Sequence, residues 1–207
     1  MTTTPEAGTA SDAGPIRPRI APLPVRQWPR AMHAALAALT PPRPRHPVPE
    51  KGADRPKGLN ALGVLARYPE LTHAFNVFNG HLLFATALSI RQRELVVLRI
   101  AAVRESTYEW RQHVWIARNE AGLTDEEIAG VAQGPLTDAL SGAERALLRA
   151  VDELIADARI ADTTWRELSE VLDERQLMDV VFSVGAYDTI AMAFRTFGVV
   201  LDDDLKA

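Results

Sequence analysis

Helix-start signals recur along this sequence and constrain its fold more than any other feature. A Ser, Thr or Asp is followed three residues later by Glu or Gln in five pairs: Ser89/Gln92, Thr124/Glu127, Ser141/Glu144, Thr164/Glu167 and Asp173/Gln176. In this spacing the first side chain accepts a hydrogen bond from the backbone at the start of a helix, and the second side chain bonds back. No segment shows the apolar–polar alternation of a half-buried strand. The pattern therefore predicts an all-α protein.

Apolar periodicity after each start, up to the next Gly or Pro, sets the expected extent of each helix. The predicted helices span residues 25–39, 59–67, 70–87, 89–103, 108–121, 124–132, 141–157, 164–172 and 174–197. The last of these is apolar almost all round, so it must be buried on every side. It is predicted to lie at the centre of the monomer or in a subunit interface.

Three regions of the chain differ in composition. Residues 1–24 are rich in Thr, Ala, Gly and Pro and are expected to be flexible, with 18–24 extended on the body or on a neighbouring subunit. Residues 25–58 combine the first helix with a loop that contains six prolines and several cations. This loop is either a solvated connector or a lid whose cations hold a carboxylated substrate. Residues 59–207 are expected to form the helical domain.

Composition excludes several functional classes. The formal net charge of −4 argues against nucleic acid as a partner, and we find neither a secretion signal nor an apolar run long enough for a membrane, which predicts a cytoplasmic protein. The chain has no cysteine, so it has no disulfide or thiolate metal site. Its few lysines, Lys51, Lys57 and Lys206, lie in the loop or at the C-terminus, which disfavours Schiff-base chemistry. No phosphate-binding, dinucleotide-binding or zinc-protease motif occurs, and we expect no cofactor and no metal.

The candidate chemistry lies on two consecutive helices. Glu94 is a carboxylate on a mostly apolar helix, and on the next helix Glu109 and His113 are four residues apart, so they share a face. A carboxylate one turn before a histidine can orient the imidazole and raise its pKa, as proton-transfer chemistry requires. Surface Glu/His pairs at this spacing are common, but Glu94 and the aromatic neighbours Tyr108 and Trp110 favour a functional site.

Three motifs in this region resemble the carboxymuconolactone decarboxylase family, which also contains the alkylhydroperoxidase D-like proteins. They are R-x-x-E-L-V-x-L-R, Y-E-W-x-x-H-V and A-G-L-T-D-E-E-I, within a resemblance that covers roughly Leu59 to Leu201. The resemblance implies an alkylhydroperoxidase D-like helical bundle. The peroxidase branch has a glutamate followed by C-x-x-C-x-x-x-H, and its two cysteines correspond to Ser106 and Glu109 here. Without those thiols, thiol peroxidase activity is predicted to be absent.

The remaining branch implies a cofactor-free decarboxylase-like lyase that acts on a small carboxylated or lactone-type metabolite by general acid/base catalysis. His113 is the predicted proton donor, oriented by Glu109 or Glu94, with Tyr108 as a donor to the enolate oxygen. The substrate carboxylate needs a cation. Arginines of the helix predicted over 89–103 (Arg91, Arg93 and Arg99) or of the proline-rich loop can supply it. The predicted substrate-binding residues are Arg91, Arg99, Trp110 and His81.

Two further expectations follow from the same residues. His81 lies among apolar neighbours, so it is either satisfied in the core or faces a pocket. Self-association as a homotrimer or homohexamer is expected from the family resemblance and the apolar last helix. The alternative to an enzyme is a non-catalytic or auxiliary oligomeric protein that retains the fold.

Overall fold

The computed structural model describes residues 18–50 and 55–206, and every regular element in that part of the chain is helical. The elements are η1 (Val25–Gln27), α1 (Ala31–Ala37), α2 (Leu59–Leu65), α3 (Pro69–Gly80), η2 (His81–Ala85), α4 (Ile90–Val103), α5 (Thr107–Asn119), α6 (Asp125–Gln133), α7 (Gly142–Asp157), α8 (Asp162–Ser169), α9 (Glu174–Phe197) and η3 (Asp203–Leu205). The prediction of an all-α fold is confirmed.

Four of the five predicted capping boxes are present, with both reciprocal hydrogen bonds, at the starts of α4, α6, α7 and α9. The fifth, at Thr164, is wrong. There α8 begins two residues earlier, after Ala161, and the Thr164 hydroxyl donates to Glu153 Oε1 on α7 at 2.7 Å. The other oxygen of Glu153 accepts from the Ala161 backbone N–H at 2.8 Å. A side chain from a different helix thus accepts both hydrogen bonds at this helix start, which no local pattern encodes.

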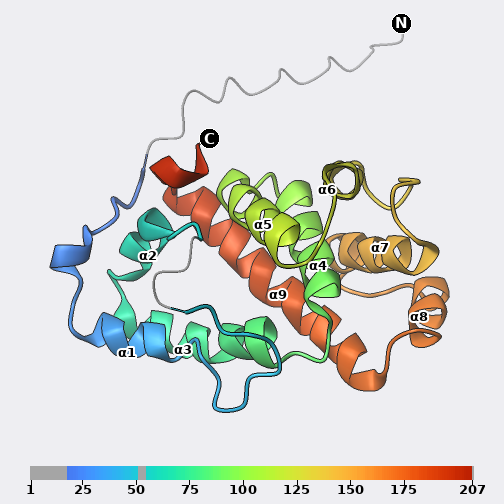
Figure 1. Ribbon diagram of the computed structural model, residues 1–207, viewed down its shortest axis with the longest axis horizontal. Coiled ribbons are helices and arrows are strands. Elements are labelled where there is room, and N and C mark those ends of the chain that lie inside the picture. The colour runs from blue at the N-terminus through green and yellow to red at the C-terminus, as the bar shows by residue number, and fades with distance from the viewer. Residues whose placement is uncertain (1–17, 51–54, 207) are drawn as a thin grey trace, which may run out of the picture.

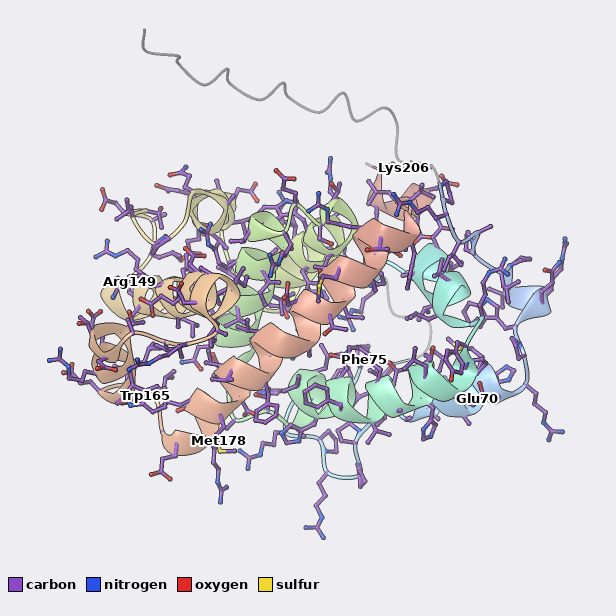
Figure 2. The ribbon with its side chains drawn as sticks, turned by 180° about the vertical axis from the view of Figure 1, so that it is seen from behind. Glu70, Phe75, Arg149, Trp165, Met178 and Lys206 are labelled. Carbon is purple, nitrogen blue, oxygen red and sulfur yellow. The ribbon has the colours of Figure 1, made fainter. Side chains whose placement is uncertain are left out.

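The core is built around α4 and α9. Helix α9 crosses the molecule diagonally, with α4 and α5 on one side of it and α1 and α3 on the other (Figure 1). Helix α4 packs against α5, α6, α7 and α9, and its apolar residues from Leu95 to Leu98 are fully buried. Seen from behind, α9 extends from the region of Met178 towards Lys206, while α3 lies beside it and carries Phe75 (Figure 2).

Helix α9 corrects one expectation from the sequence. With 24 residues and a mean hydropathy of 1.4 over its most apolar window, it is long and apolar enough to cross a membrane by length and composition, contrary to the sequence analysis. Half of that window is buried inside the structure, as in the core helix of a folded domain. Two acidic side chains on it bond inward. Asp179 accepts from the Thr86 hydroxyl at 2.8 Å, and Asp188 pairs with Arg104 at 2.5 Å.

The predicted helix over 25–39 is interrupted. Trp28 precedes Pro29 and takes an extended conformation (ψ 132°), because a residue before proline is disfavoured in the helical region. Only α1 is a regular α-helix there; it packs on α3, and its buried residues Met32 and Ala35 form a small apolar cluster with Ala66. The predicted helix over 70–87 changes to a π-helical turn at His81 and ends at Ala85.

The segment before η1 lies extended on the body. The Ile20 N–H donates to the Phe197 carbonyl at 3.1 Å, and the Leu23 N–H donates to the Gly63 carbonyl at 2.9 Å. A Cβ at Gly63 would lie 2.6 Å from the Leu23 carbonyl oxygen, so this close approach requires glycine. The expected flexibility of the N-terminal region concerns mainly residues 1–17, which lie outside the described residues.

Candidate active site

A cavity of about 700 Å³ lies between α2, α3, α5, α9 and the proline-rich loop. Most of its wall is apolar and includes Leu62, Leu65, Phe75, Leu83, Ile190 and Phe194. Polar side chains from α4, α5 and α9 also border it, among them Arg93, Glu109, His113 and Tyr187. A concave, mostly apolar cavity with a few convergent polar groups is the usual form of a small-molecule site.

Helix α5 directs Glu109 and His113 inward. Its buried residues are Tyr108, Glu109, His113, Ile116 and Ala117, spaced as one helical face. The turn before the helix places Glu105 at a φ of 51°, which lets the chain reverse tightly from α4 into α5. The two helices pack directly on one another, so residues of α5 can meet residues of α4.

The strongest polar contact in the cavity joins α4 to α5. Glu94 is fully buried, and its Oε2 lies 2.7 Å from His113 Nδ1. Its Oε1 accepts from Arg93 Nε at 2.9 Å, while Arg93 Nη1 donates to the Leu83 carbonyl. Burial alone would raise the pKa of Glu94, but the charges and hydrogen bonds of His113 and Arg93 hold that pKa below its usual value. Glu94 is therefore an ionised carboxylate that fixes the imidazole.

The contact to Glu94 determines which histidine nitrogen can react. With Nδ1 donating to a carboxylate, Nε2 is the ring atom left to face a ligand. Within the described residues, Nε2 has no hydrogen-bond partner. The imidazole also packs edge-on against the Tyr187 ring, with centroids 5.4 Å apart. The ring is held from two sides, and its free nitrogen belongs to a residue that lines the cavity.

Glu109 behaves differently from Glu94. Its residue exposure is 1%, and neither carboxyl oxygen has a hydrogen-bond partner among the described residues. Burial raises the pKa of Glu109 to about 8, against a smaller opposing effect of the Ser106 hydroxyl and with a contribution from the negative charge of Asp188, so this side chain is mostly protonated at neutral pH. The expectation that either glutamate could orient His113 is resolved in favour of Glu94. Glu109 is a separate carboxylic acid one helical turn away.

Tyr108 does not reach the cavity wall. Its hydroxyl donates to Asp202 Oδ2 at 2.5 Å and accepts from the Ala61 N–H at 3.4 Å, while its ring packs edge-on against Phe194. The hydroxyl therefore ties α5 to α2 and to the C-terminal segment. Its predicted role as a donor to an enolate oxygen is not supported by this position, because the proton already has a carboxylate partner.

The predicted substrate-binding arginines are also elsewhere. Arg91 bridges Glu127 on α6 at 2.5 Å and Glu144 on α7 at 2.6 Å. Arg99 pairs with Asp152 on α7 at 2.6 Å. Both cations join α4 to the helices opposite the cavity, and neither lines it. These positions do not support the prediction that they bind substrate, because each guanidinium is already neutralised within the fold.

Trp110 and His81 lie outside the cavity as well. Trp110 is half-buried and packs against the main core. The His81 side chain is 56% exposed, with Nε2 3.5 Å from Asp179 Oδ1. Neither of the two expectations for His81, a core position or a pocket, is met. It lies at the π-helical turn, where the regular helical register that underlay the prediction is lost.

Several polar groups of the cavity were not assigned from the sequence. Tyr187 is the most prominent, since it is buried on α9 and contacts His113. The available signal was a tyrosine inside an otherwise apolar run, VVFSVGAYDTIAMAF, where a phenol needs a reason to be buried. Asn79 on α3 also lines the cavity, and its Oδ1 is buried without a partner among the described residues.

The proline-rich loop forms part of the cavity wall through His46, Arg55 and Lys57. The His46 Nε2 lies 2.9 Å from the Leu88 carbonyl. Arg55 pairs with Glu120 at 2.9 Å and lies over the Trp115 ring, 5.9 Å from its centroid. Cations of this loop thus lie at the cavity, as required by the hypothesis that the loop holds a carboxylated substrate. Lys51 lies outside the described residues.

Among residues 18–50 and 55–206, no group of three or more His, Asp or Glu side chains is close enough to hold a metal ion. The acidic groups nearest His113 are Glu94, which is ion-paired, and Glu109, which is not.

Comparison with known proteins agrees with the resemblance inferred from the motifs. Residues 69–153 match the Carboxymuconolactone decarboxylase family, a span that contains Glu94, Glu109 and His113 but not Tyr187. No curated protein sequence matches the chain significantly. The family resemblance is confirmed over this shorter span.

Solved structures share the fold at low sequence identity. One is the alkylhydroperoxidase AhpD core of an uncharacterised peroxidase-related protein from Ralstonia eutropha JMP134, with TM-score 0.65 and 21% identity, covering 79% of this chain and 95% of that chain. Another, from Silicibacter sp. TM1040, is an uncharacterised peroxidase-related protein with TM-score 0.61 and 17% identity, covering 69% and 78%. The debrominase Bmp8 in complex with 2,3,4-tribromopyrrole has TM-score 0.69 and 12% identity, covering 93% and 96%. These likenesses confirm the alkylhydroperoxidase D-like fold.

Proposed function

We propose that this chain, whose residues 69–153 match the carboxymuconolactone decarboxylase family, is a cofactor-independent enzyme that transfers a proton at a carbon next to a carbonyl group. The specific reaction we propose is decarboxylation of a small carboxylated or lactone-type metabolite. The observation that carries the proposal is the Glu94–His113 pair, which leaves Nε2 of His113 free on a residue that lines an apolar cavity.

The proposed step uses groups with different protonation states. The bond to the carboxylate carbon breaks, carbon dioxide leaves, and the electron pair enters an enolate. His113 Nε2–H then gives its proton to the carbon, and the imidazole recovers a proton from water. Glu94 remains ionised and stabilises the imidazolium before the transfer, while protonated Glu109 donates a hydrogen bond to the substrate. Glu94, as a carboxylate, thus stabilises the protonated histidine, and Glu109, as a carboxylic acid, donates the hydrogen bond.

Recognition of a substrate carboxylate falls to the loop. Arg93 has two nitrogens engaged with Glu94 and the Leu83 carbonyl, so it supports the catalytic pair. Arg55 and Lys57 also line the cavity, but Arg55 is already paired with Glu120, so we propose Lys57 as the cation in place of Arg91 and Arg99. Its position at the wall fits an apolar ligand with one anionic end.

Thiol peroxidase activity is outside the proposal, although two of the structural relatives are described as peroxidase-related. A thiolate is the nucleophile in such chemistry, and this chain contains no cysteine. The positions that correspond to the redox pair hold Ser106 and Glu109, both buried.

The proposal is tested in two stages. Small 2-oxo acids, lactone carboxylates and aromatic carboxylates are screened for thermal stabilisation, since a ligand of the folded state raises apparent stability. Hits are then incubated in deuterated water, and carbon dioxide release and deuterium incorporation next to the carbonyl are measured. The expected result is both signals with the native chain and neither with His113→Gln. Ligands that stabilise the protein but never exchange or release carbon dioxide would favour the non-catalytic alternative.

We further propose that the chain self-associates as a homotrimer or homohexamer. Large apolar side chains remain exposed on α3 and α9, among them Leu71, Val77, Phe78, Met178, Phe182 and Met192. Phe78 and Phe182 pack edge-on, 6.1 Å apart, so the exposed patch runs from one helix to the other. Contiguous patches of this kind mark interaction sites. Light scattering at micromolar concentration should give a trimeric or hexameric mass, and a monomeric mass would refute this assembly.

A further inference from the structure

Tyr187 is a buried aromatic residue that has no role in the proton transfer described above. It is 4% exposed, it lines the cavity, and its ring edge packs against His113. Its hydroxyl has no hydrogen-bond partner among the described residues, in contrast to Tyr108, whose hydroxyl donates to Asp202. A buried phenol normally finds a partner, so an unused donor at a cavity wall indicates that a ligand supplies the acceptor.

Glu109 presents the same situation from the neighbouring helix. Its side chain is almost completely buried, it lines the cavity, and both of its oxygens lack partners among the described residues. A buried polar group without a hydrogen-bond partner destabilises the fold. Two such groups in the same cavity as His113 therefore mark a place where a ligand atom with lone pairs is expected.

Both groups hold their protons near neutral pH. Burial, with the negative charge of Glu94 as the next cause, raises the pKa of the Tyr187 phenol well above its ordinary value. Burial likewise keeps Glu109 protonated at neutral pH. Two neutral donors in an apolar cavity favour an oxyanion, because they stabilise developing negative charge without carrying charge that would need solvation.

We propose that Tyr187 and Glu109 form an oxyanion-binding site, in which the Tyr187 hydroxyl is a catalytic donor to the enolate oxygen of the substrate. The assignment rests on the proposed function, because the enolate is the intermediate of that reaction. It also names the ligand class: planar enolate or phenolate oxyanions attached to an apolar body. Tyr187 takes the place that the sequence analysis gave to Tyr108.

The test uses a probe in place of the unknown substrate. 4-Nitrophenol is an oxyanion mimic whose ionised form absorbs visible light. Nitrobenzene has nearly the same shape but lacks the phenol oxygen. Binding of both to the full-length protein is measured by calorimetry, and ionisation of bound nitrophenol by absorbance. Tyr187→Phe should weaken nitrophenol binding about 10- to 100-fold, the range for a hydrogen bond to a charged group, and change nitrobenzene binding by less than about 2-fold.

Tyr108→Phe is the matched comparison, since it removes the hydroxyl of the other buried tyrosine next to this region. If nitrophenol binding falls with Tyr108→Phe instead of Tyr187→Phe, the donor is misassigned. Equal losses of both probes with Tyr187→Phe would indicate packing alone and overturn the proposal, as would no loss of either. Glu109→Leu gives the second measurement and should also weaken nitrophenol selectively.

The two proposals fail in different ways. If His113→Gln abolishes deuterium exchange while Tyr187→Phe binds nitrophenol normally, the proposed function stands and the oxyanion assignment falls. If Tyr187→Phe loses nitrophenol selectively while His113→Gln exchanges deuterium at the native rate, the oxyanion site stands and the mechanism of proton transfer is wrong.

Discussion

The two sides of α4 carry the same kinds of residue but serve different purposes. On the side towards α6 and α7, Arg91 and Arg99 form partly exposed ion pairs that hold three helices together. On the side towards α5, Arg93 and Glu94 are buried and meet His113 beside the cavity. With 3.6 residues per turn, Arg93 is rotated by about 200° from Arg91, which is enough to move a cation from one side to the other.

The two groups of ion pairs differ in whether they leave a reactive atom unpaired at the cavity. In the pairs of Arg91 and Arg99, the side chains of one helix meet those of another and no reactive atom is left facing a cavity. In the buried cluster, Glu94 receives two donors and fixes an imidazole whose second nitrogen is unused. A charged residue on α4 therefore does not reveal by its presence alone whether its role is catalytic or structural. The direction of each side chain around the helix axis decides between them.

The largest expected effect is on the cavity side. His113→Gln should lower turnover by about 10²–10⁴-fold, the usual range for loss of a general acid or base, while the protein still folds and assembles. Glu94→Gln should show a comparable loss, because a neutral amide no longer stabilises the imidazolium. The matched change on the other side, Asp152→Asn in the Arg99 pair, should leave turnover within about 2-fold. Steady-state kinetics on the substrate found by the screen, with circular dichroism as the folding check, makes this comparison.

Full turnover in His113→Gln would erase the distinction between the two sides. A variant that unfolds would instead make His113 a packing residue, and the proposed mechanism would fail.

The two glutamates of the site, Glu94 and Glu109, differ in protonation at neutral pH, and this difference predicts a pH dependence of stability. A carboxyl whose folded pKa is raised to about 8 binds more protons when folded than when unfolded, so its contribution to stability falls as pH rises from the unfolded pKa of 4.5 to about 8. Glu109→Gln removes this titration. Its stability advantage over the native chain should therefore grow between pH 5 and pH 8, by at most about 1.4 kcal/mol per pH unit.

Urea unfolding at several pH values measures this difference. Glu126→Gln, an exposed glutamate on α6, is the control and should give a nearly constant difference over the same range. A flat curve for Glu109→Gln would mean that Glu109 is ionised in the folded protein. The neutral-donor role proposed for it would then be untenable.

The outcome of these assignments shows what local sequence can and cannot encode. The capping boxes at α4, α6, α7 and α9 depend on residues three apart, and they were predicted correctly with the helices that they start. The Glu109–His113 spacing correctly indicated a shared buried face. The partner of each side chain was not encoded locally, since Glu94 meets His113 across 19 positions and Tyr108 meets Asp202 across 94. Tyr187 joins the site only because α9 packs on α4.

The smallest expected effect belongs to the side of α4 opposite the cavity. The Arg99 side chain is 12% exposed, donates to both oxygens of Asp152, and also donates to the Val131 and Ala132 carbonyls at 3.1 and 3.2 Å. Arg99→Met keeps much of the apolar stem but removes these donors, so it should destabilise the protein by about 1–3 kcal/mol with turnover unchanged.

The exposed pair Arg159–Asp162, with side chains 74% and 83% exposed, provides the reference for that loss. Arg159→Met should change the free energy of unfolding by no more than about 0.5 kcal/mol, because solvent already screens both charges. Urea unfolding of the two variants beside the native chain ranks them. If Arg99→Met also reduced turnover, the α6 and α7 side of α4 would be coupled to the cavity, and the division of this helix into a structural and a chemical side would need to be abandoned.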